Sequence, residues 1–138
     1  MKIIIQPFTV RKRFPLTISR GTATGNTNLW VKVQAEDVEG WGEATPFSIS
    51  QDHACTTEEL QQELQQVIPR LTSLHPLDRQ QITAILDQTS VSTATQAAID
   101  MALYDWLGKR TQLPLWQLWG LNIQKIVPTS VTIGISSP

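Results

Sequence analysis

The first 45 residues carry the alternation of apolar and polar positions that is typical of β-strands. A β-branched run predicts a strand over 2–13, and residues 28–37 alternate regularly enough to predict a second strand with one buried face. Between them, the Thr- and Asn-rich run 22–28 has no apolar period and predicts a loop. Gly40, which tolerates positive φ, indicates a turn before a short third strand. We therefore expect a three-stranded antiparallel meander.

The second half of the chain changes to the apolar spacing of helices. Thr56 stands three residues before Glu59, a capping-box pattern that marks a helix start, and Pro69 is expected to kink or shift the last turn of that helix. Further helices are predicted at 77–88 and 93–109, and the second of these opens on another Thr–Gln capping-box pattern. These segments together predict a helical bundle.

The end of the chain returns to strand-like composition. A short helix or turn is predicted at 113–120, and the β-branched run 125–135 predicts a strand. This last strand has no neighbour in sequence with which to pair. It either returns to the first sheet or belongs to something outside this chain. Strands grouped before helices indicate an α+β domain.

Composition narrows the class of protein. A chain of 138 residues with 41% hydrophobic residues is long enough and apolar enough for one folded domain. Its net charge of −1 gives no strong attraction to nucleic acid or to an anionic membrane. No apolar run approaches the roughly 20 residues that span a bilayer, and the opening MKIII is too short for a signal peptide. The single Cys55 excludes an intrachain disulfide. We expect a cytoplasmic location.

Two carboxylates in the most apolar helix are the first candidates for chemistry. Asp100 and Asp105 lie five positions apart, which places them roughly 140° apart around a helix, so they cannot form a close pair. Asp105 precedes Lys109 by four residues, a favourable ion-pair spacing. Asp100 precedes Tyr104 by four residues, and the Tyr104 hydroxyl is expected to donate to it. We interpret both aspartates as structural.

The remaining polar residues form no complete catalytic pattern. His53 and His75 have no metal-ligand spacing with Cys55. Glu43, at the end of the third predicted strand, is interpreted as a hydrogen-bonded structural residue. No nucleophile elbow, phosphate loop or dinucleotide fingerprint is present. The tryptophans at 106, 116 and 119 are predicted to form an aromatic core between helices.

Three segments taken together resemble a known family. They are GWGEATP after an alternating strand, the helical run AAIDMALYDWLGKRTQLPLWQLWG, and the following VPTSVTIGIS. In this order they are similar to the N-terminal part of enolase-superfamily enzymes, in the subgroup that contains muconate lactonizing enzyme and mandelate racemase. The resemblance covers essentially the whole chain. The segment PLTISRG and the Thr in SVTIGIS are most similar to dipeptide epimerases of the L-Ala-D/L-Glu type.

The resemblance implies an architecture and a division of labour. Residues 1–124 would be a capping domain over the mouth of a (β/α) barrel, and residues 125–138 would begin the first barrel strand. In the family, a lysine acid–base pair and three acidic Mg²⁺ ligands lie on later barrel strands, where the metal stabilises an enolate formed next to a carboxylate. Because such a barrel needs about 200 residues or more, we expect Mg²⁺ in the full-length parent, none bound by this chain, and no activity from this chain alone.

Two capping-domain loops shape specificity in the family, and they map here to 16–26 and 45–53. Arg20 in the first loop is expected to meet a substrate carboxylate, for which the guanidinium fork is suited. The alternative is a solvated Arg20 beside the basic run 11–13. Thr132 corresponds to a threonine that faces substrate at the end of the first barrel strand, with an ordinary strand residue as the alternative.

Phe47 and Ile49 are expected to supply an apolar wall for the substrate. Two functions stay open. The parent is a Mg²⁺-dependent epimerase acting on a dipeptide or another small carboxylate, with o-succinylbenzoate synthase and muconate cycloisomerase as alternatives. Otherwise the chain is a non-catalytic domain that binds a partner or itself, as a homo-oligomer, through an exposed strand and apolar surface in 114–135.

Overall fold

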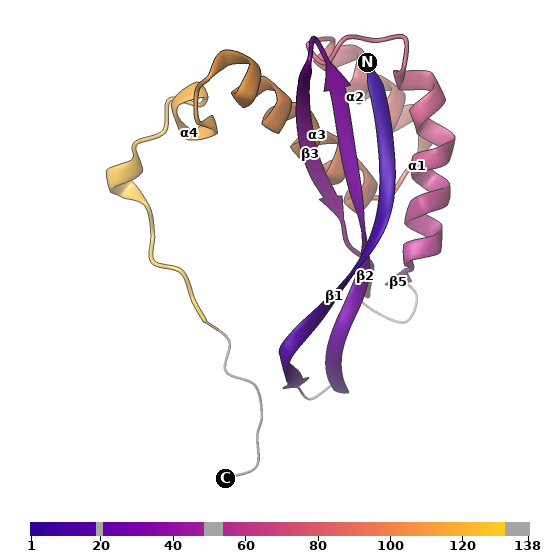
Figure 1. Cartoon of the computed structure of the whole chain (residues 1–138), viewed down its shortest axis with the longest axis vertical. Coiled ribbons are helices and arrows are strands. Elements are labelled where there is room, and N and C mark those ends of the chain that lie inside the picture. Colours follow the sequence, from indigo (N-terminus) through magenta and orange to yellow (C-terminus); the bar gives the residue numbers. More distant parts are fainter. Residues whose placement is uncertain (19–20, 49–53, 132–138) are drawn as a thin grey trace.

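The computed structural model describes residues 1–18, 21–48 and 54–131, which form a sheet, a layer of helices and an extended C-terminal arm (Figure 1). The elements follow in the order β1 (Lys2–Ile18), β2 (Gly21–Ala35), β3 (Val38–Ala44), β4 (Phe47–Ser48), β5 (Ala54–Cys55), α1 (Thr57–Leu71), α2 (Arg79–Thr89), α3 (Thr93–Thr111), α4 (Leu115–Leu118) and the 3-10 helix η1 (Ile123–Lys125). Three antiparallel strands come first and helices follow. The predicted α+β class and meander are therefore confirmed.

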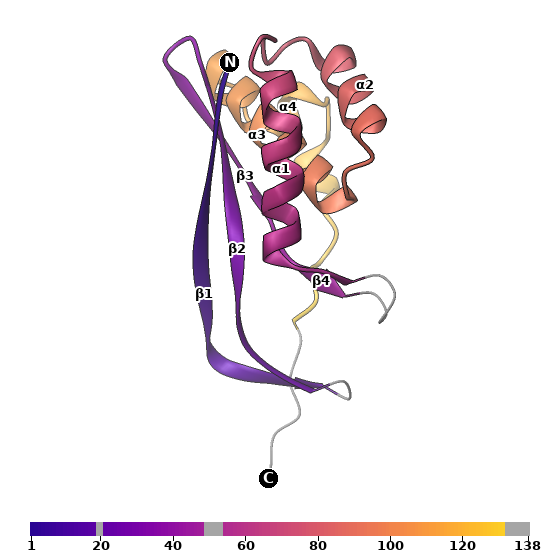
Figure 2. The ribbon, with the colours of Figure 1, turned by 90° about the vertical axis from the view of Figure 1, so that its right-hand side faces the viewer.

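The sheet has the order β1-β2-β3, with a tight turn between β2 and β3 at Glu36 and Asp37, both at positive φ. Figure 2 shows the helices on one face of this sheet. Alternate residues of β2 are fully buried on that face: Leu29, Val31 and Val33. This alternation is the one that the sequence pattern predicts, and it fixes which face of the sheet forms the core.

The expected loop at 22–28 is wrong, because β2 begins at Gly21 and pairs with a long extension of β1. Thr22 and Thr27 share side-chain hydrogen bonds with Thr17 and Thr9 across the strands, at 2.9 and 3.0 Å. Both faces of this distal hairpin are largely exposed, so its strands need no apolar alternation. Cross-strand pairing determines the structure here, and that information is not local in sequence.

The helix caps agree with the sequence in one case and shift in another. Thr56 caps α1 with the complete capping box to Glu59, as predicted, and the helix continues through Pro69 to Leu71. Helix α3 is capped by Ser92, whose side chain accepts from the Thr95 amide. The predicted Thr–Gln box at the start of α3 is therefore wrong by one residue, because the helix begins one position earlier than its first apolar residue suggests.

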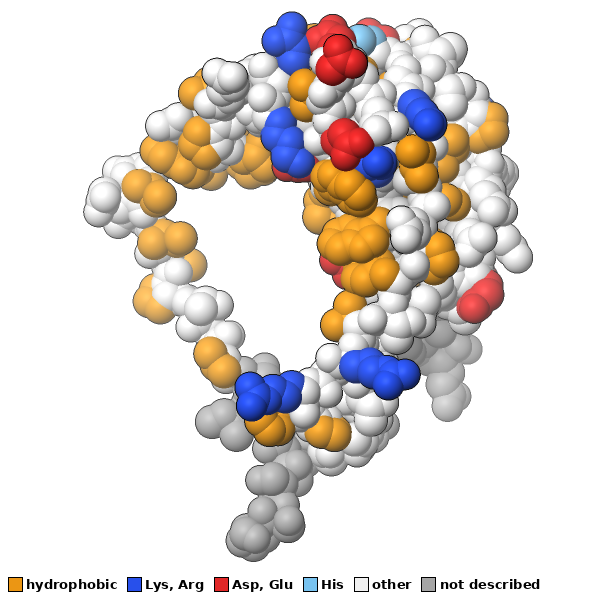
Figure 3. Space-filling view, viewed as in Figure 1, with side chains coloured by type: hydrophobic (Ala, Val, Ile, Leu, Met, Phe, Trp, Pro, Cys, Tyr) orange, Lys and Arg blue, Asp and Glu red, His pale blue; other side chains and the backbone are white. Residues whose placement is uncertain are grey.

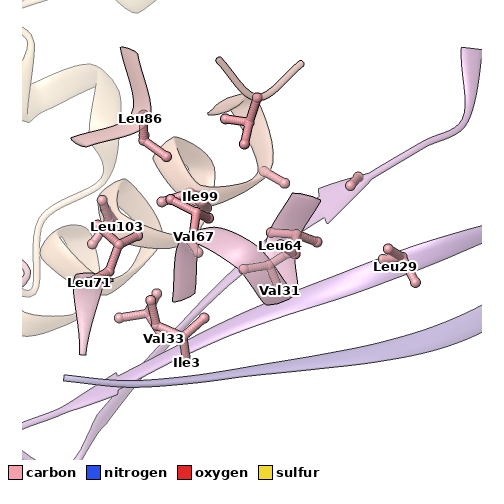
Figure 4. Close-up of a cluster of buried hydrophobic side chains, with 14 of the residues drawn as sticks. Ile3, Leu29, Val31, Val33, Leu64, Val67, Leu71, Leu86, Ile99 and Leu103 are labelled. Atoms are coloured by element: carbon pink, nitrogen blue, oxygen red, sulfur yellow. The ribbon is translucent and has the colours of Figure 1, made fainter. Parts of the chain in front are cut away.

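The core lies between the sheet and the helices (Figure 4). Its buried apolar members are Ile3, Leu29, Val31, Val33, Ala44, Leu60, Leu64, Val67, Leu71, Ile82, Leu86, Val91, Ala98, Ile99, Ala102, Leu103 and Trp106. Helix α3 packs on β3 at the two glycines of the GWGEA run. A Cβ atom on Gly40 would lie 2.0 Å from the Ala102 carbonyl oxygen, and one on Gly42 would lie 2.0 Å from that of Ala98. These glycines let a helix backbone approach a strand directly.

The arm, residues 112–131, leaves the helical layer after α3 and carries α4 and η1. Figure 3 shows an opening between the arm and the sheet, with apolar side chains on both sides. Residues 126–131 are in no strand, so the described part of the predicted strand 125–135 is wrong. The side chains of Ile126, Val127 and Val131 are 79%, 80% and 84% exposed. A β-branched run becomes a strand only beside another strand.

The predicted tryptophan core is correct for one residue of three. Trp106 is 1% exposed and donates from its indole nitrogen to the Ala35 carbonyl at 3.0 Å. Trp116 and Trp119 are 37% and 52% exposed, and Trp119 meets Tyr104 edge to face. Both residues lie at the start of the arm, beyond the layer of helices that covers the sheet. Among the described residues, no helix is long and apolar enough to cross a membrane.

Candidate functional site

The end of the sheet near β4 and β5 holds the one predicted substrate residue that the structure describes. Phe47 pairs with Cys55, and Ser48 pairs with Ala54, so β4 and β5 form a short antiparallel ladder. Phe47 is half-buried. An open pocket of about 520 Å³ lies beside it, lined by Glu43, Thr45, Phe47, Thr93, Ala94 and Ala97. The pocket joins the end of β3 to the first turns of α3, and most of its lining is apolar.

Glu43 at the rim of this pocket is held by its neighbours. The Asn28 side-chain amide donates to a Glu43 carboxylate oxygen at 2.5 Å, and the Thr45 hydroxyl donates to the same oxygen at 3.4 Å. Asn28 is only 6% exposed, and its side-chain oxygen Oδ1 has no hydrogen-bond partner among the described residues. The structural interpretation of Glu43 is thus supported, since its carboxylate already serves as an acceptor between two strands.

A second carboxylate fixes the helical wall of the pocket. One oxygen of Glu63, on α1, accepts from the Ser92 amide at 3.0 Å, from the Ser92 hydroxyl at 2.6 Å and from the Thr95 hydroxyl. Thr95 is fully buried. The sequence analysis did not predict this network. A threonine such as Thr95 among apolar residues at a helix start does indicate a buried hydroxyl that needs a hydrogen-bond partner. The network ties the start of α3 to α1.

The start of α1, which follows β5, is fixed by hydrogen bonds to the sheet and within its own first turn. The Thr57 hydroxyl donates to the Thr27 carbonyl at 2.5 Å, and the Thr56 amide donates to Glu59 at 2.8 Å. Burial raises the pKa of the Cys55 thiol, and the carboxylates of Glu63 and Glu59 raise it further. The thiol therefore stays protonated at neutral pH and is a poor nucleophile. This end of the domain offers shape and hydrogen bonds rather than a reactive group.

Three of the four predicted substrate residues, Arg20, Ile49 and Thr132, lie outside the described residues, as does His53. Their proposed roles stay predictions. Phe47 alone is placed, and it lies on the pocket. Among residues 1–18, 21–48 and 54–131, no group of three or more His, Cys, Asp and Glu side chains could hold a metal ion. The family resemblance places the Mg²⁺ ligands on later barrel strands rather than among these residues.

The two aspartates of α3 have separate structural partners. The Asp105 carboxylate accepts from the Trp41 amide at 2.8 Å and from Lys109 at 2.6 Å, so the predicted Lys109 pair is confirmed. Asp100 pairs with Arg79 of α2 rather than with Tyr104 as predicted. The Arg79 guanidinium lies over the Tyr104 ring, 4.2 Å from its centroid. Arg79 could not be found by local spacing, because it lies on another helix.

His75 also has a structural partner, at the opposite end of the sheet. Glu36, in the β2–β3 turn, contacts His75 at 3.1 Å and accepts from Arg110 at 2.6 Å. These hydrogen bonds, first from Arg110 and then from His75, lower the pKa of Glu36. The cluster joins the turn, the α1–α2 connection and the end of α3. It lies far along the fold from the pocket and contributes to stability.

The comparison with known families agrees with this architecture. Residues 1–120 match the model of the mandelate racemase / muconate lactonizing enzyme N-terminal domain. This match covers most of the chain. The chain therefore belongs to the N-terminal domain family of the mandelate racemase and muconate lactonizing enzymes, within the enolase superfamily.

Curated relatives include dipeptide epimerases. The chain is 37% identical over 138 residues to a hydrophobic dipeptide epimerase of a Flavobacteria bacterium (strain MS024-2A), covering 100% of this chain and 38% of that protein. It is 32% identical over 140 residues to the L-Ala-D/L-Glu epimerase of Bacteroides thetaiotaomicron, covering 100% of this chain and 35% of that protein. The chain thus spans little more than a third of these relatives.

Solved structures show the same fold. A dipeptide epimerase from Cytophaga hutchinsonii, complexed with Mg and D-Ala-L-Val, superposes with a TM-score of 0.85 at 24% identity over 99% of this chain and 37% of that chain. A dipeptide epimerase from Enterococcus faecalis V583, complexed with Mg and L-Leu-L-Tyr, gives a TM-score of 0.75 at 26% identity over 84% of this chain and 33% of that chain. The likeness extends along the arm in the first case.

Proposed function

We propose that this chain is the capping and specificity domain of a Mg²⁺-dependent dipeptide epimerase, with residues 1–124 forming the cap and residues 125–138 beginning a barrel. The observation that carries the proposal is the family membership of residues 1–120 together with dipeptide epimerases among the relatives at 32% and 37% identity. The reaction would remove the proton α to a carboxylate of a dipeptide. The parent protein would act in the cytoplasm.

The part played by this chain is to bind and exclude water rather than to move the proton. Phe47, fixed by the β4–β5 ladder, would present an apolar wall to the substrate together with Ile49. Arg20 would bind the substrate carboxylate as a bidentate donor, and Thr132 would face the substrate from the first barrel strand. Apolar closure of this kind strengthens electrostatic interactions in a site and prevents side reactions.

The metal and the proton-transferring groups would come from the remainder of the parent. When bound there, Mg²⁺ would stabilise the negative charge of an enolate. The described residues offer no metal cluster, and the carboxylates of Glu43, Glu63, Asp100 and Asp105 all have structural partners. We expect the isolated chain to be inactive for this reason.

A second activity within the superfamily has one observation in its favour. The chain is 29% identical over 140 residues to the o-succinylbenzoate synthase of Geobacillus kaustophilus. A muconate cycloisomerase is the other alternative. The parent's substrate distinguishes these, since only an epimerase would invert a centre in a dipeptide such as L-Ala-L-Glu.

Two experiments test the proposal. The purified chain, incubated with L-Ala-L-Glu and Mg²⁺, should give no D-amino acid by chiral chromatography, and turnover above a no-protein blank would overturn the division of labour. The genomic DNA downstream of codon 138 should encode a Lys-x-Lys pair followed by spaced Asp, Glu and Asp codons, in frame or in an adjacent gene. A downstream region without them would contradict the assignment of the parent.

A further inference from the structure

Asn28 on β2 is a buried polar residue whose bonding is not explained by stability. The residue is 6% exposed, and its oxygen Oδ1 has no hydrogen-bond partner among the described residues. A buried acceptor without a partner lowers stability, and most buried polar atoms are paired. The side-chain nitrogen Nδ2, in contrast, donates to the Glu43 carboxylate at 2.5 Å. An unpaired oxygen of this kind is expected where a side chain is retained for what it holds in place.

The contact between Asn28 and Glu43 lies where the sheet ladder stops. The ladder between β2 and β3 ends at the pair of Leu29 and Ala44. The next position in this register sets Asn28 opposite Thr45, which lies beyond the end of β3. The Thr45 hydroxyl donates at 3.4 Å to the same Glu43 oxygen that accepts from Asn28. Side-chain hydrogen bonds therefore continue the connection between β2 and the chain that follows β3.

The preceding residue of β2 holds the start of α1. The Thr57 hydroxyl, in the first turn of α1, donates to the Thr27 carbonyl at 2.5 Å. β4 and β5 lie in sequence between the two attachment points, and they pair with each other, with Phe47 opposite Cys55. Figure 2 shows β4 and the start of α1 at the same end of the sheet. Consecutive residues of one strand thus attach both flanks of the ladder that carries Phe47.

The hydrogen bond from Asn28 is the stronger of the two that Glu43 accepts from described residues. Because an ionised carboxylate only accepts, the nitrogen of Asn28 must face it. Both described donors, Asn28 and Thr45, are neutral, and the Thr45 contact is longer by 0.9 Å, the difference between 3.4 and 2.5 Å. Glu43 and Phe47 line the same pocket of about 520 Å³. Asn28 therefore sets the direction of a carboxylate beside the predicted apolar wall.

We propose that Asn28 is a positioning residue for substrate binding, which acts on Phe47 through Glu43. Loss of its donor would release the chain after β3 from β2, and the β4–β5 ladder would no longer keep Phe47 in one position on the pocket. Binding groups must be held closely in place by the residues behind them. The effect on substrate rests on the proposed function, in which Phe47 contacts the dipeptide, whereas the attachment itself is a property of the 138-residue chain.

Hydrogen exchange of the 138-residue chain, followed by mass spectrometry, tests the attachment. Asn28→Asp replaces the donor with a second carboxylate facing Glu43. Amide exchange in β4 and β5 should rise by about tenfold, because the hydrogen bond is lost and like charges repel. The matched control Gln6→Glu makes the same change of amide to carboxylate at an exposed position of β1, and exchange should stay within about twofold of wild type.

A double variant provides the rescue. Asn28→Asp with Glu43→Gln exchanges donor and acceptor at unchanged net charge, and exchange should return to within about twofold of wild type. Unchanged exchange in Asn28→Asp, or no recovery in the double variant, would overturn the proposal. Where Asn28→Asp fails to fold by circular dichroism, Glu43→Gln alone decides. It keeps an acceptor but makes the hydrogen bond neutral, so exchange should rise by about threefold, and no rise would overturn the proposal.

Steady-state kinetics of the full-length parent test the effect on substrate. With L-Ala-L-Glu and with L-Leu-L-Tyr, Asn28→Asp should raise KM by about tenfold and leave kcat within about twofold, and the double variant should restore KM. A purely structural residue would lower the amount of folded enzyme without changing KM. Exchange that rises while KM stays unchanged would overturn the positioning role. A wild-type parent inactive on both dipeptides would overturn the proposed function and this role with it, while the exchange result still decides the attachment.

Discussion

The close approach of α3 to β3 gives the sharpest prediction about this fold. The amino-acid change is Gly42→Ala. An added Cβ would lie 2.0 Å from the Ala98 carbonyl oxygen and 3.0 Å from the Ala102 amide nitrogen, whereas ordinary contacts begin near 3.4 Å. The nearest atoms are backbone, so no side chain can rotate away. To bring the 2.0 Å contact with the Ala98 oxygen out to 3.4 Å, the strand and the helix must separate by about 1.4 Å.

Such a separation disturbs the most buried part of the core. Ala98, Ile99 and Ala102 are all fully buried on α3. Overpacking of a core costs about 1–3 kcal/mol, and a clash with backbone belongs at the upper end. Replacing glycine by alanine also lowers the conformational entropy of the unfolded chain, which stabilises the folded state by about 0.4–1 kcal/mol. The net expectation is a loss of about 2 kcal/mol in the free energy of unfolding.

Urea denaturation followed by far-UV circular dichroism measures this loss. Gly108→Ala is the matched control, because a Cβ there would lie 3.1 Å from the Leu113 carbonyl oxygen and 3.5 Å from a Leu115 side-chain atom. In a helix interior, alanine stabilises the helix by about 1 kcal/mol relative to glycine, and this gain offsets the cost of the milder contact. The control should stay within about 1 kcal/mol of wild type. A Gly42→Ala protein as stable as wild type would refute the close-packing argument.

Two further changes test the polar network and the charged turn. Thr95→Val removes the buried hydroxyl that donates to Glu63, and should lower the free energy of unfolding by about 1–3 kcal/mol in urea titrations, whereas the exposed Thr129→Val should not. Glu36 has a pKa below its ordinary 4.5 in the folded state. Its contribution is therefore present above pH 4.5 and is lost as the pH falls through the folded-state pKa. Thermal melts of wild type and Glu36→Gln should converge on acidification, and a stability difference independent of pH would contradict this.

Local patterns predicted the elements that are decided locally. The alternation in β2 and the capping box at Thr56 both correspond to observed structure. The distal hairpin was missed because polar strands exposed on both faces carry no apolar period, and only pairing with β1 reveals them. For the arm, the error was the opposite one, because a strand was predicted where none is observed. Its β-branched composition predicts a strand, but the described chain places no strand beside residues 126–131.

The roles of the predicted site residues stay predictions, and only the position of Phe47 can be compared with the structure. Resemblance indicated Phe47 and the segment around it, and the structure places Phe47 on a pocket closed by the β4–β5 ladder. It could not indicate Asn28 or Glu63, because each acts through a partner at least 15 residues away in sequence. The GWGEA glycines lack the sequence pattern of a phosphate loop. These glycines allow α3 to pack closely on β3, and that contact joins residues that are far apart in sequence.

The central claim is that this chain supplies the cap of a dipeptide epimerase while the chemistry lies elsewhere. The most direct measurement is made on a chimera in which residues 1–124 replace the corresponding cap of the Bacteroides thetaiotaomicron epimerase, a 32% identical relative. The assay is incorporation of deuterium from solvent at the α-carbon of a dipeptide in the presence of Mg²⁺. We predict exchange by the chimera and none by the 138-residue chain. A folded chimera without exchange, on acidic or hydrophobic dipeptides, would contradict the claim.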